Sequence, residues 1–164
     1  MSKRSVQVLL AVLLVIIALV LTVKLRYAGK APMKLTAESC DASLWKHVYQ
    51  PERLRVIETC TAVEGRVVSV RQARDGDLHI ALDPDHKSAL NFANALHDEG
   101  DLIVEIVCEH SAEDDAPKSA CSGFVSKVTP PKTGDRIRVT GAYVTDIEYG
   151  WNEIHPATRI EILR

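Results

Sequence analysis

The sequence has few aromatic residues and lacks the short motifs that mark common catalytic sites. Phe, Trp and Tyr together make up 5% of the 164 positions. There is no G-x-S-x-G nucleophile elbow, phosphate-binding loop or dinucleotide-binding fingerprint. No two cysteines have the C-x-x-C spacing of a zinc knuckle or a redox motif. These absences argue against nucleophilic catalysis and against nucleotide-dependent chemistry.

Charged residues, proline and glycine are all missing between Val6 and Val23. As a helix with a rise of 1.5 Å per residue, this stretch would be about 27 Å long, close to the roughly 30 Å of hydrocarbon in a bilayer. Basic residues flank it on both sides: Lys3, Arg4, Lys24 and Arg26. We therefore expect residues 6–23 to cross a lipid bilayer once, within an anchor that covers residues 1–26.

A cleaved signal peptide is the main alternative, because it also has a basic start and an apolar run. The run is longer than the usual apolar region of about 7–15 residues. Lys24, Arg26 and Lys30 also crowd the place where a peptidase would cut, and Pro32 would follow the cut. These features favour an uncleaved anchor.

The even number of cysteines favours a domain outside the cytoplasm. Basic residues on both sides of the apolar run leave its orientation undecided by charge. Four scattered cysteines fit two disulfides in an oxidising compartment, which would leave the N-terminus in the cytoplasm. Four buried free thiols in a cytosolic domain are the alternative. Of the three possible connectivities we expect Cys40 with Cys60 and Cys108 with Cys121, since each pair brackets a segment that a bridge would fix to a strand.

The region after the apolar run reads as a short tether, residues 27–38, and one β-rich domain, residues 39–164. Alternating apolar residues predict five strands, and two short helical segments accompany them. The strands are expected at Cys60–Arg74, Leu78–Asp83, Leu102–Glu109, Arg136–Ile147 and after Gly150, with helices at 41–48 and at Ser88–Asp98, where Leu90, Ala93 and Leu96 would face inward. Long strands with internal glycines predict a mainly β fold, an OB-like five-stranded β-barrel, although a sandwich would also fit.

Six stretches taken in order strengthen this prediction. They are HVYQPERL at 47–54, C-x-x-V-x-G at 60–65, DGDLHI at 75–80, GDLIVEIVC at 100–108, GDRIRVTGAYV at 134–144 and GWNEIHP at 150–156. As a set they resemble an uncharacterised family of small OB-fold-like domains. The resemblance implies the fold and carries over no activity, ligand or site residue. One departure is that an OB-fold usually has its helix after the third strand, whereas here it precedes that strand.

Two acid-x-His pairs are the best candidates for chemistry. Asp77 and His79 share one strand face, and so do Glu153 and His155. A carboxylate with two imidazoles can hold Zn²⁺ or a similar divalent ion, which would allow a metal-dependent hydrolase. In an OB topology, however, these pairs begin antiparallel strands and are expected some 15–20 Å apart. The simpler interpretation is that each pair fixes a turn by hydrogen bonds.

Charge and aromatic placement bear on possible partners. Six of the 20 Lys and Arg flank the apolar run, which leaves 14 against all 22 Asp and Glu and a net charge of about −8 for the rest. Such a domain is a poor phosphate binder, so nucleic acid is not an expected partner. Tyr143, Tyr149 and Trp151 lie near the last turn, where an unknown protein, a sugar or another small polar ligand could stack, although packing in the core or the turn is the simpler interpretation. We therefore expect a membrane-anchored, extracytoplasmic, non-catalytic binding or accessory module. The metal-dependent hydrolase and oligonucleotide or oligosaccharide binding remain the alternatives.

Overall fold

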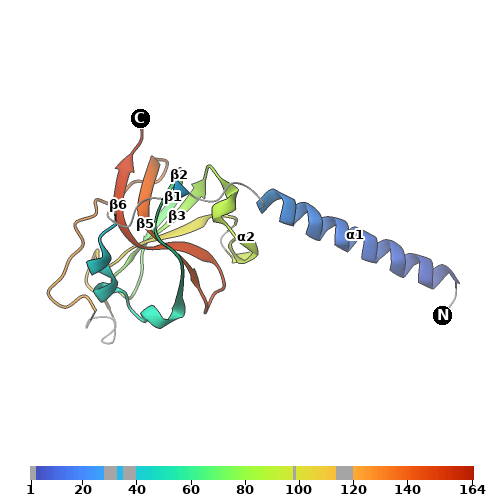
Figure 1. Ribbon diagram of the computed structural model, residues 1–164, viewed down its shortest axis with the longest axis horizontal. Coiled ribbons are helices and arrows are strands. Elements are labelled where there is room, and N and C mark those ends of the chain that lie inside the picture. Colours follow the sequence, from blue (N-terminus) through green and yellow to red (C-terminus); the bar gives the residue numbers. More distant parts are fainter. Residues whose placement is uncertain (1–2, 28–32, 35–39, 98, 114–119) are drawn as a thin grey trace.

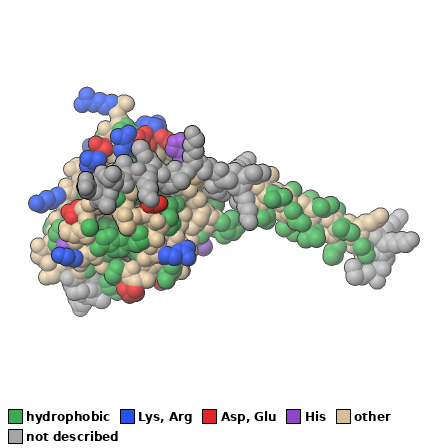
Figure 2. Space-filling view, viewed as in Figure 1, with side chains coloured by type: hydrophobic (Ala, Val, Ile, Leu, Met, Phe, Trp, Pro, Cys, Tyr) green, Lys and Arg blue, Asp and Glu red, His purple; other side chains and the backbone are tan. Residues whose placement is uncertain are grey.

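The protein is represented by a computed structural model, which describes residues 3–27, 33–34, 40–97, 99–113 and 120–164. Its first element is α1, Lys3–Tyr27, most of which projects away from the sheet domain (Figure 1). Ser5–Thr22 has a mean hydropathy of 2.9 and none of it is buried. Hydrophobic side chains cover the surface of this helix (Figure 2). The helix is therefore long and apolar enough to span a membrane.

The domain is mainly β. Its single sheet contains β1 (Met33–Lys34), β2 (Leu54–Gln72), β3 (Leu78–Pro84), β4 (Leu102–Ile106), β5 (Arg136–Asp146) and β6 (Asn152–Ile162). The strand order is β1-β2-β3-β4-β6-β5, and β2 also pairs with β5. All pairings are antiparallel except that of β4 with β6. Each of the five longer strands thus has at least two neighbours. Most of the predicted tether, at residues 28–32 and 35–38, lies outside the described residues.

The long strand β2 begins six residues before the predicted start at Cys60. Its first residues pair with the far end of β5, Leu54 opposite Asp146. At Gly65 the strand pairs with both β3 and β5, and an added Cβ there would lie 2.4 Å from the backbone oxygen of Asp83. The early start depends on a partner strand far along the chain, so local alternation could not predict it.

The predicted helix at Ser88–Asp98 is shorter than expected. The structure has one turn of 3-10 helix, η4 (Lys87–Ala89), followed by α2 (Phe92–His97). Leu90 is buried as predicted, but Leu96 is 63% exposed and Asn94 is buried instead. The inward position of Leu96 was therefore wrong. Asn94 faces inward because its amide donates hydrogen bonds to the backbone oxygens of Asp101 and Asn152.

Two apolar clusters pack against the sheet. The inner cluster contains Ile80, Leu82, Leu102, Val104, Ile106, Ile137 and Ile154 among others. The outer cluster contains Leu44, Val48, Leu54, Val107, Cys108, Ala142 and Val144, with Trp45, Cys121 and Phe124 beside them. Leu44 and Trp45 belong to the 3-10 helix η2 (Ala42–His47), which Asp41 caps by accepting a hydrogen bond from the backbone nitrogen of Ser43. Consequently both faces of β4 are buried.

Two disulfides are present, with the pairing expected from the sequence. Cys40 is bonded to Cys60, and Cys108 is bonded to Cys121. The first bond fixes the start of the domain to β2. The second holds the segment after β4 against the outer face of the sheet. Disulfides of this kind are typical of an oxidising compartment.

Candidate functional site

The strand register gathers acidic and histidine side chains on the outer face of three neighbouring strands. His79 of β3 is opposite Glu105 of β4. On its other side β4 runs parallel to β6, with Ile103 opposite Glu153, so His155 is level with Glu105. Asp77 lies just before β3, in the turn that follows β2, and its carboxylate reaches the same row of side chains.

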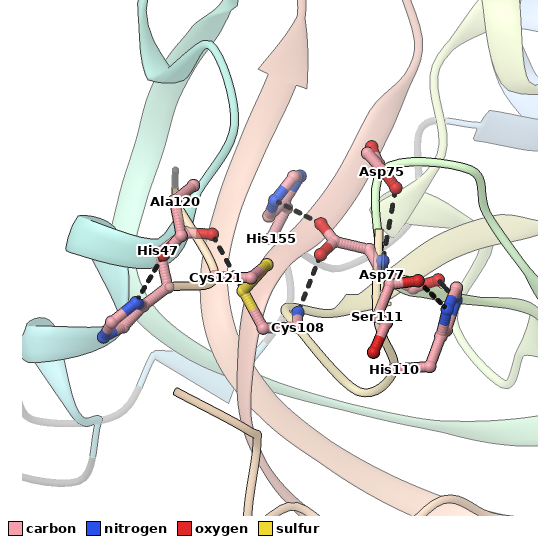
Figure 3. The surroundings of a disulfide bond; sticks show 9 residues. All are labelled: His47, Asp75, Asp77, Cys108, His110, Ser111, Ala120, Cys121 and His155. Carbon is pink, nitrogen blue, oxygen red and sulfur yellow. Dashed lines mark hydrogen bonds and ion pairs between the residues drawn. A yellow bond between two sulfur atoms is a disulfide. The ribbon is translucent and has the colours of Figure 1, made fainter. Parts of the chain in front are cut away.

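The distances within this cluster are short. The Nδ1 atom of His155 lies 3.1 Å from Glu105 Oε2 and 3.1 Å from Glu153 Oε1. Its Nε2 atom lies 3.8 Å from Asp77 Oδ2. His79 Nε2 is 3.1 Å from Glu105 Oε1. Figure 3 shows the carboxylate of Asp77 between His155 and the backbone nitrogen of Cys108.

The structure therefore corrects the expected separation of 15–20 Å between the two acid-x-His pairs. That expectation treated the strands as if each ran the full height of the barrel. Because β4 has only five residues, its last residues face the start of β3 while its first residues face the start of β6. His79 and His155 are thus both level with Glu105, one on each side of β4, and are separated by two strand spacings of about 4.8 Å each.

Neighbouring groups hold the cluster in place. Trp151 donates a hydrogen bond from Nε1 to Glu153 Oε2, at 2.9 Å. The backbone nitrogen of Cys108 donates to Asp77 Oδ1, at 2.8 Å. Glu153 and His155 contact each other within β6, whereas the carboxylate of Asp77 faces His155 and not its sequence neighbour His79.

Several atoms of the cluster are buried without a hydrogen bond. Among the described residues these include Asp77 Oδ2, Glu105 Oε2, His155 Nε2 and both ring nitrogens of His79. The side chains of Asp77, Glu105, Glu153 and His155 are at most 3% exposed. A buried polar atom without a hydrogen-bond partner costs free energy. The presence of several such atoms in one cluster therefore requires an explanation.

Burial and mutual contact shift the pKa values of the cluster strongly. Burial raises the pKa of Glu105 to about 8 and that of Asp77 to about 6. Burial alone would lower the pKa of His155, but the carboxylates of Glu105 and Glu153 raise it to about 9. Burial lowers the pKa of His79 to about 4, so this imidazole is neutral at physiological pH. Burial would raise the pKa of Glu153, but its hydrogen bond with His155 lowers it.

Sequence reasoning did not include three residues of the site. Glu105 lies between the two histidines, and Asp146 at the end of β5 is paired with Arg53, whose Nε is 3.3 Å from Asp146 Oδ2. One signal was available for Glu105, because it is the single charged residue in the otherwise apolar run from Leu102 to Val107. An acid in such a buried strand is rarely left without a partner.

The aromatic group near the last turn divides into two parts. Tyr149 and Trp151 stack with ring centroids 4.3 Å apart, and Tyr149 is 48% exposed. Tyr143 is buried instead, where its hydroxyl donates to the backbone oxygen of Ala89 and accepts from Asn152 Nδ2. Tyr143 is thus a core residue, and Tyr149 and Trp151 form a small surface platform.

The clefts identified among the described residues lie elsewhere. One of them, between η2 and β6, has a volume of about 350 Å³, and Asp41, Leu44, Phe124 and Ile160 contribute to its lining. Neither this cleft nor the two others is lined by Asp77, Glu105, Glu153 or His155. With at most 3% of each side chain exposed, Asp77, Glu105, Glu153 and His155 offer almost no surface to a substrate in this conformation.

In comparison with known proteins, no family model and no curated protein matches the chain.

Proposed function

We propose that this protein is a single-pass membrane protein whose extracytoplasmic, OB-like domain acts as a non-catalytic binding or accessory module. The main support for this proposal is that one chain contains both an exposed apolar helix and a domain with two disulfides. The helix supports anchoring through residues 6–23, and the disulfides support an oxidising compartment for the domain.

The strand arrangement supports the OB-like barrel. The pairings run from β2 through β3, β4, β6 and β5 and return to β2. An OB-fold is a five-stranded Greek-key barrel, and a ring of five paired strands is what such a barrel requires. The position of α2 before β4 is the departure already evident in the sequence.

Burial of the acid and histidine cluster favours a binding module over a metal-dependent hydrolase. A hydrolase must bring its substrate within contact of the metal ligands, and here these side chains are at most 3% exposed. The platform of Tyr149 and Trp151 is accessible and suits a protein surface or a sugar ring.

Topology is the first test of this proposal. Membranes from cells that express the full chain are washed with alkaline carbonate, and intact cells are then treated with a protease. We expect the chain to remain with the membranes and its domain to be cleaved from outside. Release of a soluble form that begins near Pro32 would contradict the anchor, and protection of the domain would contradict its location.

Partner capture tests the binding role. The full chain is cross-linked in its native membranes, and its partners are compared with those of Tyr149→Ala and of the control Ile162→Ala. Ile162 is 55% exposed and lies at the far end of β6. We expect a partner that is lost with Tyr149→Ala and kept with the control. Equal capture by all three chains would contradict a role for the platform.

A further inference from the structure

Three buried residues in the cluster offer one ligand atom each within a small space. The ligand atoms of Asp77, Glu105 and His155 all lie within 4.8 Å of one another, and all three residues are buried. They come from the turn before β3, from β4 and from β6. A group bound between them would therefore connect three strands at one point.

Two atoms that lack a hydrogen bond are among those that a bound ion would use. Asp77 Oδ2 and His155 Nε2 make no hydrogen bond, and Glu105 Oε2 has an ion-pair contact with His155 Nδ1 at 3.1 Å, although each residue is at least 98% buried. The opposite atoms of the same side chains do have partners. Cys108 donates to Asp77 Oδ1, and Glu153 lies 3.1 Å from His155 Nδ1. This division of roles is typical of metal ligands that neighbouring groups orient.

The buried charges around the three residues do not balance. Four carboxylates lie in or beside the cluster, those of Asp77, Glu105, Asp146 and Glu153, and all four residues are buried. The cations facing them are Arg53 and, when protonated, His155. Buried carboxylates in excess must bind protons or another cation.

We propose that Asp77, Glu105 and His155 bind one divalent transition-metal ion, with Zn²⁺ as the first candidate, and that this ion joins β3, β4 and β6. An imidazole together with carboxylates is a ligand set for Zn²⁺, whereas Ca²⁺ and Mg²⁺ prefer oxygen alone. Ligand atoms of a tetrahedral zinc site are roughly 3.3 Å apart, given bonds of about 2.0–2.2 Å. Small side-chain movements would bring the three atoms to that spacing. The proposal does not depend on the membrane topology or on the binding role.

Other residues take supporting positions around this site. Glu153 orients His155 through Nδ1 and is itself held by Trp151. His79 contacts Glu105 through the oxygen that the ion does not need, at 3.1 Å. A second combination, Asp77 with Cys108 and Cys121, lies close together as well, but its two sulfur atoms are joined in a disulfide and are not free to bind metal.

Metal content of the full chain tests the proposal directly. The chain is purified in a mild detergent without a histidine tag or chelator, and its metals are measured by inductively coupled plasma mass spectrometry. We expect about one zinc per chain, and at least a fivefold lower content in Glu105→Gln and Asp77→Asn. The matched control is His86→Gln, because His86 is exposed and its side chain makes no capping hydrogen bond in η4.

Reconstitution keeps the proposal testable if a variant folds poorly. The wild-type chain is stripped with a chelator and titrated with Zn²⁺, or with Co²⁺ for its visible absorption, while thermal unfolding is followed. We expect saturation at one equivalent with a rise in the melting temperature of the wild type and of His86→Gln. Glu105→Gln, which keeps the shape of a neutral carboxyl, should unfold at the temperature of the stripped wild type and show no rise with zinc.

Two results would overturn the metal site. One is a wild-type chain that contains no metal and neither saturates with nor is stabilised by Zn²⁺ or Co²⁺, which would mean that protons alone neutralise the carboxylates. The other is metal that is lost with His86→Gln as readily as with Glu105→Gln, which would place it on the surface. Neither result would bear on the membrane anchor or on partner capture, so failure of this proposal is distinguishable from failure of the binding module.

Discussion

The two faces of β4 are equally buried and chemically opposite. Its inner face carries Leu102, Val104 and Ile106, which are 0% exposed and belong to the apolar core. Its outer face carries Ile103 and Glu105, which are also buried, and Glu105 contacts His79 and His155. Burial of an apolar layer stabilises the folded state by about 25 cal/mol for each Å² of apolar surface removed from water. A charged layer loses hydration when buried and is stable only while every charge keeps its partner. Burial alone therefore does not indicate how a layer contributes to stability.

The strongest test of this contrast is the substitution His155→Leu. Leucine has a comparable volume, so packing is kept, but Glu105 and Glu153 lose the imidazole that faces both of them. We expect unfolding to become easier by about 3–5 kcal/mol, the usual cost of removing one partner of a buried pair. Urea unfolding of the full chain in detergent, followed by fluorescence, measures it, because Trp45 and Trp151 both lie in the domain. A loss below about 1 kcal/mol would show that His155 does not balance these carboxylates.

Removal of a disulfide distinguishes the polar layer from the rest of the domain. Cys108→Ser combined with Cys121→Ser opens a loop with a sequence separation of 13, which should cost about 3 kcal/mol. The matched variant replaces Cys40 and Cys60, whose separation is 20. Because the backbone nitrogen of Cys108 also donates to Asp77, we expect the first variant to lose more stability than the second. Both variants are compared by urea unfolding without reductant. A larger loss of stability in the variant that lacks Cys40 and Cys60 would show that the Cys108–Cys121 disulfide does not support the cluster.

The substitution Tyr143→Phe removes one polar atom from the inner side. Its hydroxyl donates to the backbone oxygen of Ala89 and accepts from Asn152 Nδ2, and burial raises the pKa of Tyr143 to about 12. Phenylalanine would leave those two groups buried without this partner, at a cost of about 1–3 kcal/mol. The same urea experiment measures the loss. An unchanged unfolding midpoint would mean that water or Thr145 replaces the hydroxyl.

The smallest expected effect belongs to the residue that precedes His155 in β6. Ile154 points into the apolar core with 0% exposure, and Ile154→Val removes one methylene group there. We expect a loss of about 0.5–1.5 kcal/mol. Ile154 and His155 are adjacent in β6 and face opposite layers, so the losses of stability in Ile154→Val and His155→Leu compare the two layers directly. If Ile154→Val were the more damaging of the two, the contrast between the layers would be wrong.

Local patterns predicted the parts of the fold that depend on local rules. Strict alternation located β3, and the even side of Leu78, Ile80 and Leu82 is buried as expected. The apolar run predicted α1, and the segments that the cysteines bracket predicted both disulfides. Patterns failed where a distant partner decides the outcome, as for the start of β2 and the exposed Leu96.

Four residues of the acid and histidine cluster were singled out from the sequence, but their geometry and Glu105 were missed. Asp77, His79, Glu153 and His155 were recognised from their acid-x-His spacing. Their proximity follows from a short β4 between β3 and β6, which alternation cannot reveal because strand length and register are set by pairing across the sheet. Glu105 was missed because a single acid in an apolar strand resembles an ordinary outward-facing residue until both faces are known to be covered.

The parallel pairing of β4 with β6 also orders events during biosynthesis. His155 lies in β6, the last strand in the described part of the chain, and is synthesised about 50 residues after Glu105. The contact between the two side chains can therefore form only late in synthesis. Until β6 docks, β4 and β5 also expose edges that can pair with other chains. A chain cut short before Asn152 should therefore be retained by chaperones or degraded, because its outer layer cannot assemble without β6.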